Sequence, residues 1–171
     1  MRSRGEREGP SGTAKDRALR LLAVRWRSRE ELRRRLRQAG FEAEDISTAL
    51  DDLQRAGLVE DERFARELVR DQARRRLAGD RVIRNVLREK GVAPDIAESV
   101  LEEAGDEAER ARELAARRAA RMTGLDPEAA YRRVYGLLLR RGFGHRTAAE
   151  AARHALADRV PDDVEELSDT P

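Results

Sequence analysis

The sequence contains no cysteine, which excludes disulfide bonds and thiolate metal ligands. Its two histidines, His145 and His154, lie nine residues apart, so they do not share a helix face as an i, i+4 metal pair would. A glycine-rich phosphate loop of the GxxxxGK(S/T) kind is also missing. We therefore expect no catalytic, metal-binding or cofactor-binding residues, and a protein that is not an enzyme.

Long apolar runs are missing as well. No run approaches the roughly 18 residues that a membrane-spanning helix needs, so we expect no membrane contact. Residues 1–13 are basic, but no apolar segment follows them, which excludes a secretory signal. Together with the lack of cysteine, these features are compatible with a reducing cytoplasm, and we expect a cytoplasmic monomer.

Aromatic residues are scarce, at 4% of the chain, whereas charged residues make up 41% and hydrophobic residues 39%. Alanine, leucine, glutamate and arginine dominate, and this usage favours helices throughout. The small share of large apolar side chains predicts a thin core in each unit. Neighbouring units are therefore expected to support one another.

A repeat of 51 residues orders the chain. Gly40-Phe41, Gly91-Val92 and Gly142-Phe143 are spaced by 51 residues. The apolar positions before them keep the same step: Leu32 and Leu36, then Ile83 and Leu87, then Val134 and Leu138. A glycine just after an apolar helix stripe is typical of a helix end in the left-handed region. The pattern predicts an all-α fold of three tandem three-helix repeats that form an elongated, curved array.

The predicted segments follow from this period. Residues 1–13 lack apolar periodicity and are expected to be a disordered arm. The three repeats are expected at residues 14–58, 59–105 and 106–160. Residues 161–171 are expected to be an acidic tail that frays.

Local signals in the first repeat predict how its helices begin and end. Ser28 and Glu31 have the spacing of a reciprocal capping box. Trp26 continues the apolar stripe of Leu19 and Leu22, so it is expected in the core. Gly57 is expected to end the third helix, with Leu58 as its apolar contact.

The second repeat carries similar signals. Asp61 is a candidate N-cap, and Phe64 opens the apolar stripe of the helix that follows it. The segment 77–79, Leu-Ala-Gly, is expected to break that helix. Asp80 can then cap the next helix, whose apolar face includes Ile83.

Basic and acidic blocks alternate in phase with the repeat. Residues 15–37, 63–90 and 110–141 carry net charges of +7, +6 and +6, whereas residues 42–62 and 91–109 each carry −7. If the repeats stack, this pattern predicts one basic and one acidic surface.

Two arginine runs, at residues 33–35 and 74–76, allow two interpretations. One is contact with phosphate or with an acidic protein surface. The other is a solvated helix face in a chain that has 34 arginines and 2 lysines, because such clusters are weakly specific. The recurrence of the runs with the repeat favours a binding function. A trihelical DNA reader would need a basic third helix for the major groove, whereas the third helices of the first two repeats are acidic.

Three segments of the second repeat carry a family resemblance: Glu60-Asp61-Glu62-Arg63-Phe64-Ala65, Gly79-Asp80-Arg81-Val82-Ile83 and Leu87-Arg88-Glu89-Lys90-Gly91-Val92. Trp26-Arg27-Ser28 in the first repeat and Arg140-Arg141-Gly142-Phe143 in the last belong to the same set. In this order they resemble the RecX family, the regulators of the bacterial RecA recombinase. The chain departs from the family pattern at Glu60, often an aspartate there, and in its alanine-rich last helix.

The resemblance implies a non-enzymatic regulator of homologous recombination, DNA repair and the SOS response. Such a protein binds the filament of RecA on single-stranded DNA and inhibits recombinase ATPase, strand exchange and coprotease activity. The alternative is a trihelical nucleic-acid-binding protein that acts directly on single- or double-stranded DNA. Candidate residues for binding the filament or its phosphates are Arg25, Arg27, Arg33, Arg34, Arg74, Arg75, Arg76, Arg81, Arg84, Arg88 and Lys90. The residues of the structural motif are Asp61, Phe64, Gly79, Ile83 and Gly91.

Overall fold

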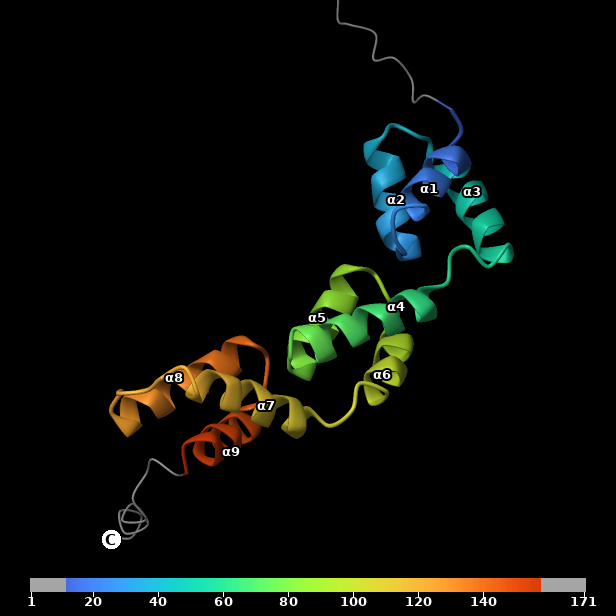
Figure 1. Cartoon of the computed structure of the whole chain (residues 1–171). Helices are drawn as coiled ribbons and strands as arrows, with labels where there is room; N and C mark the ends of the chain where they lie inside the picture. The colour runs from blue at the N-terminus through green and yellow to red at the C-terminus, as the bar shows by residue number, and fades with distance from the viewer. Residues whose placement is uncertain (1–11, 158–171) are drawn as a thin grey trace, which may run out of the picture. The chain divides into compact units, whose positions relative to one another are not determined.

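The computed structural model describes residues 12–157, and these residues form nine α-helices and no strand (Figure 1). The helices are α1 Ala14–Leu22, α2 Arg29–Gln38, α3 Ala43–Arg55, α4 Asp61–Arg70, α5 Asp80–Glu89, α6 Pro94–Glu102, α7 Glu107–Ala119, α8 Pro127–Arg140 and α9 His145–Leu156. The all-α prediction is confirmed. Most of the predicted arm, the end of the third predicted repeat and the whole predicted tail lie outside the described residues.

Packing divides the described chain into two compact units. The N-terminal unit combines residues 12–68 with residues 87–100, and the C-terminal unit combines residues 69–86 with residues 101–157. The second repeat therefore contributes segments to both units.

In the N-terminal unit, α1, α2 and α3 pack around an aliphatic core. Leu32 and Leu36 from α2 and Leu50 from α3 are fully buried, and Ile46 and Leu53 are buried beside them. Each such side chain contributes roughly 1.5–3 kcal/mol when it leaves water. The predicted apolar positions of α2 and α3 are confirmed.

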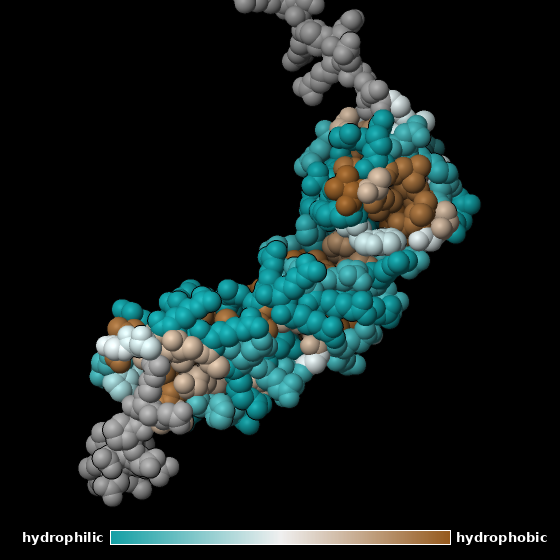
Figure 2. Space-filling view, viewed as in Figure 1, coloured by the Kyte–Doolittle hydropathy of each residue, from teal (hydrophilic) through white to brown (hydrophobic). Residues whose placement is uncertain are grey.

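The start of the first repeat differs from the prediction. Thr13, assigned to the arm, is the N-cap of α1 and forms a reciprocal capping box with Asp16. The helix buries Ala14 and Ala18, whereas Leu19 is 39% exposed. Figure 2 shows an apolar patch over the α1–α3 region of this unit. The helix ends at Leu22, four residues earlier than a stripe reaching position 26 requires.

Trp26 lies in the loop between α1 and α2, so its prediction as a core residue is wrong. Its ring is only partly buried, and the Arg63 guanidinium lies 4.1 Å from the ring centroid in a cation–π contact.

The end of the third helix also differs in part from the prediction. Gly57 has a φ of 68° as predicted, but Leu58 is 43% exposed and Val59 is the buried residue.

The helix break of the second repeat is confirmed. After Arg70, α4 continues into a π-helical turn, η1 Asp71–Arg75, in which the Arg76 amide donates to Asp71 O at 3.2 Å. Leu77 then takes a φ of 46° although it is not glycine, and its side chain is buried. The left-handed conformation costs roughly 1–2 kcal/mol, which burial of the leucine offsets. Phe64 is 5% exposed, so its predicted burial is confirmed as well.

In the C-terminal unit, α7, α8 and α9 surround a core in which alanine is the commonest residue. Phe143 is the largest fully buried side chain, and Leu138 and Leu156 lie with it in the core. Because an alanine buries little area, these few large side chains carry much of the apolar stabilisation.

The 51-residue period recurs as a pair of equivalent junctions between repeats. In the N-terminal unit, Ser28 Oγ donates to Lys90 O, from the turn after α5. In the C-terminal unit, the Gly79 amide donates to Arg141 O, from the turn after α8, at 2.9 Å. Ser28 and Gly79 are 51 residues apart, as are Lys90 and Arg141.

An acidic side chain caps the neighbouring helix at each junction. The Arg29 amide, at the start of α2, donates to Asp61 Oδ1 at 2.8 Å, and the Asp80 amide, at the start of α5, donates to Glu107 Oε1 at 2.9 Å. Asp61 and Asp80 are the first residues of their helices, so their prediction as N-caps is corrected. Both bonds satisfy an amide that a helix leaves unpaired, and the negative charge favours a helix N-terminus.

The glycines of the period are needed for two reasons. Gly91 and Gly142 have φ values of 72° and 92°, and each lies against the start of a neighbouring helix. A Cβ atom at Gly91 would come within 2.4 Å of the Glu30 Cβ, and one at Gly142 within 2.6 Å of a Val82 methyl. Gly91, predicted as a structural motif residue, and its repeat equivalent Gly142 are therefore needed both for the backbone conformation and for the close approach.

Gly142→Ala should destabilise the protein more than Gly124→Ala. Both glycines have positive φ, at 92° and 85°, but no described atom lies within 4 Å of a Cβ built at Gly124. The cost of placing an alanine at positive φ is therefore similar at both positions. The free energy of unfolding should fall by roughly 1–3 kcal/mol more at Gly142, because the added Cβ overpacks the junction. Denaturant unfolding of both variants measures the difference, and equal losses would contradict the close-approach account.

Candidate functional site

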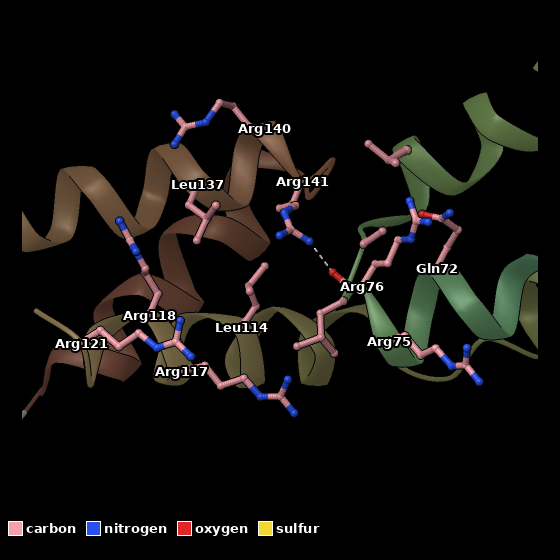
Figure 3. Close-up of a pocket in the computed structure, with 13 residues that line it drawn as sticks. Gln72, Arg75, Arg76, Leu114, Arg117, Arg118, Arg121, Leu137, Arg140 and Arg141 are labelled. Atoms are coloured by element: carbon pink, nitrogen blue, oxygen red, sulfur yellow. Dashed lines mark hydrogen bonds between the residues drawn. The ribbon is translucent and has the colours of Figure 1, made fainter.

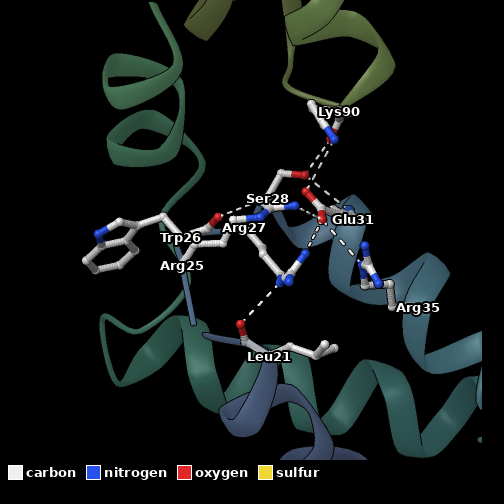
Figure 4. Close-up of polar contacts among 8 residues, drawn as sticks. All are labelled: Leu21, Arg25, Trp26, Arg27, Ser28, Glu31, Arg35 and Lys90. Atoms are coloured by element: carbon white, nitrogen blue, oxygen red, sulfur yellow. Dashed lines mark hydrogen bonds and ion pairs between the residues drawn. The ribbon is translucent and has the colours of Figure 1, made fainter. Parts of the chain in front are cut away.

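Glu31 is the centre of a buried ionic cluster in the N-terminal unit (Figure 4). Its side chain is 2% exposed, and Oε1 accepts hydrogen bonds from Arg25, Arg27 and Arg35. The other oxygen, Oε2, lies 3.6 Å from Lys90 Nζ. The cluster therefore joins the loop after α1 and the turn after α5 to the first turn of α2.

The charge of these partners fixes the ionisation of Glu31. Burial alone would raise the pKa of its carboxyl, because a carboxylate is poorly solvated there. The hydrogen bond and charge of Arg25, the charge of Lys90 and the hydrogen bond of Arg27 outweigh burial and lower the pKa of Glu31 from 4.5 to about 2. The carboxylate is thus ionised at neutral pH and balances several cations.

The prediction of Arg27 as a filament or phosphate contact is wrong. Arg27 is 7% exposed, its guanidinium pairs with Glu31, and its Nε donates to Leu21 O at 3.1 Å near the end of α1.

The predicted capping box is half confirmed. Ser28 Oγ accepts the Glu31 amide at 3.1 Å, but the Glu31 carboxylate serves the cluster instead of returning to Ser28.

Four other candidates, all in the N-terminal unit, remain accessible to different degrees. Arg25 and Lys90 have side chains that are 45% and 30% exposed, although both pair with Glu31. Arg33 pairs with Glu30 one turn away. Arg34 is exposed and has no hydrogen bond or ion pair from its side chain to any residue in the range 12–157.

The candidates of the second repeat face solvent. In the C-terminal unit, Arg74, Arg81 and Arg84 are exposed, and Arg81 donates to Leu139 O at 3.1 Å. In the N-terminal unit, Arg88 is exposed. The roles of these exposed side chains as binding residues stay predictions.

An arginine-lined cavity lies within the C-terminal unit (Figure 3). Its volume is about 810 Å³, and it is bounded by η1 and the turn after it, by α7, and by the end of α8. Its arginines are Arg75, Arg76, Arg117, Arg118, Arg121, Arg140 and Arg141. Aliphatic side chains, among them Leu114 and Leu137, lie between the arginines, and no carboxylate lines the cavity.

The cavity arginines differ in their partners. Arg75 and Arg76 lie 3.6 and 3.3 Å from Asp71, and Arg117 pairs with Glu113. Arg141 donates to the neutral carbonyl of Arg76. Arg118, Arg121 and Arg140 make no side-chain hydrogen bond or ion pair with any part of the chain that the structure describes. The cavity therefore holds positive charge that the described residues do not neutralise.

Only part of this site was predicted from the sequence. Arg75 and Arg76 were among the candidates, whereas the arginines contributed by α7, by α8 and by the turns after them were not. The signal was present, since residues 110–141 form a basic block with a net charge of +6. The missing information was tertiary, because helix periodicity alone does not show which faces of η1, α7 and α8 meet.

Between residues 12 and 157, no group of three or more histidine, cysteine or acidic side chains could hold a metal ion. In the same range, no helix is both long and apolar enough to cross a membrane.

Comparison with known proteins gives matches over most of the chain. Family models described as the first, second and third three-helix domains of RecX match residues 14–53, 61–101 and 105–151. Regulatory protein RecX of Corynebacterium efficiens is 42% identical over 164 residues, which are 92% of this chain and 78% of that protein. Regulatory protein RecX of Mycobacterium avium is 41% identical over 145 residues, covering 81% of this chain and 82% of that protein.

A solved structure is also similar. The crystal structure of RecX from Lactobacillus salivarius superposes with a TM-score of 0.73 at 25% sequence identity. The match covers 83% of this chain and 94% of that chain. The prediction of three tandem three-helix domains is confirmed by these comparisons.

Glu31→Gln should lower the free energy of unfolding at neutral pH by about 3 kcal/mol, because it leaves the cations around a buried position without their anion. The pKa of Glu31 is about 2 in the folded protein and near 4.5 when unfolded, so its contribution is complete above pH 4.5. This contribution is lost as the pH falls towards 2. The difference in free energy of unfolding between the variant and the wild type should therefore shrink over that range.

Denaturant unfolding at pH 7 and pH 3 tests this expectation. The exposed Arg146–Glu150 pair provides a control, since Glu150→Gln should change stability by less than about 0.5 kcal/mol. If Glu31→Gln lowers the free energy of unfolding equally at both pH values, the carboxylate charge is not what stabilises the cluster.

Proposed function

The chain belongs to the RecX family, and from this membership we propose that it binds the filament of RecA recombinase on single-stranded DNA and inhibits recombinase ATPase, strand exchange and coprotease activity. RecX proteins are non-enzymatic regulatory proteins, so the effect is exerted by binding. The match of all three domains carries the proposal, because it extends over most of the chain and the relatives are named regulatory proteins.

Exposed arginines support contact with a filament that contains both protein and phosphate. Arg74, Arg81 and Arg84 lie in the C-terminal unit and face solvent. Guanidinium groups bind carboxylates and phosphates through paired hydrogen bonds, so the same side chains suit either component.

Major-groove reading by a third helix is disfavoured. The exposed residues of α3 include Glu44, Asp45 and Asp51, and those of α6 include Asp95 and Glu98. A helix of this charge would be repelled by the phosphates that flank a groove. The second candidate function, direct binding of nucleic acid, therefore rests on the arginine-lined cavity of the C-terminal unit.

The regulatory proposal predicts suppression of ATP hydrolysis. Added to RecA from the same species on a long single strand, the protein should lower the rate of ATP hydrolysis in a saturable manner. The protein alone should hydrolyse no ATP. An unchanged rate at saturating protein would sink the regulator proposal and favour direct nucleic-acid binding.

Arg74, Arg81 and Arg84 should contribute to filament binding. Replacing all three by glutamine should weaken co-sedimentation with RecA filaments and flatten its salt dependence. The control variant replaces Arg17, Arg37 and Arg133 by glutamine, and these are exposed arginines without side-chain partners among residues 12–157. The control should bind like the wild type, and equal losses in both variants would mean that only total charge matters.

A further inference from the structure

We infer that the arginine-lined cavity of the C-terminal unit is a binding site for the phosphates of a nucleic-acid single strand. The inference rests on the proposed function only in placing that strand inside a recombinase filament. It names a part of the filament that this chain would touch directly and the side chains that would touch it.

The first argument is uncompensated charge. Within the described residues, Arg118, Arg121 and Arg140 have no side-chain partner, and the one partner of the Arg141 side chain is a neutral carbonyl. Four guanidinium groups thus face one cavity without an anion among the described residues. Like charges held close together repel and raise the local positive potential, which attracts a polyanion.

The second argument is the chemistry of the lining. A guanidinium group offers a planar fork of donors that matches phosphate oxygens, and it is more weakly hydrated than an ammonium group. No carboxylate lines the cavity, so an entering phosphate meets no repulsion from its walls. Leu114 and Leu137 form an apolar surface between the charges, and Val82 is a further apolar residue of the lining. Sugars and bases can pack on such a surface while guanidinium planes stack on the bases.

The third argument is the distribution of the arginines. Figure 3 shows Arg118, Arg121 and Arg140 on one side of the cavity and Arg75 and Arg76 on the other, with the leucines between them. Charges spread along two sides suit a chain of successive phosphates. The volume of about 810 Å³ is that of a small-ligand site, which admits a few nucleotides and excludes a duplex.

Phosphate chemistry has a second source, the polyphosphate of a free nucleotide. The spread of the arginines favours the strand, because a triphosphate concentrates its charge at one point. A free triphosphate and the strand would occupy the same guanidinium groups. Competition between them therefore shows which of the two the cavity prefers.

Binding of the full chain to a fluorescein-labelled oligothymidylate, followed by fluorescence anisotropy without recombinase, tests the inference. Arg118→Gln, Arg121→Gln and Arg140→Gln combined should weaken binding by about tenfold or more. The slope of log affinity against log salt should fall in magnitude by about 2, from about 0.7 for each lost phosphate contact. The control variant, Arg17→Gln, Arg37→Gln and Arg133→Gln, removes the same charge outside the cavity and should bind like the wild type.

A lysine variant at the same three cavity positions separates local chemistry from folding and from charge. It keeps the charge and loses the fork, so its affinity should fall between the wild type and the glutamine variant, with the wild-type salt slope. Equal losses in the glutamine and control variants would overturn the inference, as would wild-type binding by the glutamine variant. Should the glutamine variant unfold, wild-type affinity of the lysine variant would overturn it instead.

Competitors identify the ligand chemistry. If inorganic triphosphate or ATP displaces the strand at concentrations near the Kd of the strand, the cavity binds phosphate but its ligand is a free nucleotide. That result would overturn the assignment to a single strand. Displacement by polyglutamate in preference to triphosphate would overturn the phosphate assignment in favour of an acidic protein segment. Persistence of strand binding against all three at those concentrations supports the strand as ligand.

The recombinase assay is read separately from strand binding. If the wild type binds the strand through the cavity but leaves recombinase ATPase unchanged, the proposed function fails and the cavity site stands. If the wild type inhibits ATPase while strand binding does not depend on the cavity, the proposed function stands and this inference fails.

Discussion

Both repeat junctions depend on a turn that comes within van der Waals distance of a neighbouring helix start. Gly91 and Gly142 provide the left-handed conformation and the missing Cβ that this approach requires. The turn carbonyls of Lys90 and Arg141 then reach donors 51 residues apart, the hydroxyl of Ser28 and the amide of Gly79. The period visible in the sequence is therefore the period of a packing constraint. Because thin helical units bury little apolar surface alone, such junctions supply order that the separate cores lack.

Each junction also places an arginine among buried polar groups, but by different chemistry. In the N-terminal unit, Arg27 lies beside the buried carboxylate of Glu31, which several cations share. In the C-terminal unit, Arg110 is 7% exposed, pairs with Asp80 and donates to the carbonyls of residues 78, 104 and 105. Arginine suits both positions because its five donors can satisfy several acceptors at once. These two arginines are thus structural, which shows why an arginine in a basic block cannot be assigned to binding from the sequence alone.

The helices, the repeat and most of the large core side chains could be predicted, because these depend on periodicity and on glycine positions that the sequence displays. The misplacement of Trp26 had a physical cause: α1 ends at Leu22, and an apolar stripe cannot reveal where a helix stops. Arg27 was misjudged because burial depends on Glu31 and on the Leu21 carbonyl, contacts that form only when the loop folds back. The cavity was missed for a similar reason, since it arises where η1, α7 and α8 meet and no local pattern encodes that meeting.

The division of arginines bears on function. An arginine that stabilises the fold has an acceptor, as Arg27 and Arg110 do, or an acid one turn away on its own helix, as Arg117 has in Glu113. Arg118, near the end of the same α7, and Arg121, just after it, have neither among residues 12–157, and they face other guanidinium groups across a cavity. Such an arrangement costs folding free energy through repulsion and gives no contact in return. Unlike Arg17, Arg37 and Arg133, which also lack side-chain partners among the described residues, these charges gather around one cavity, and a phosphate-bearing strand is the partner whose charge and geometry would offset that cost.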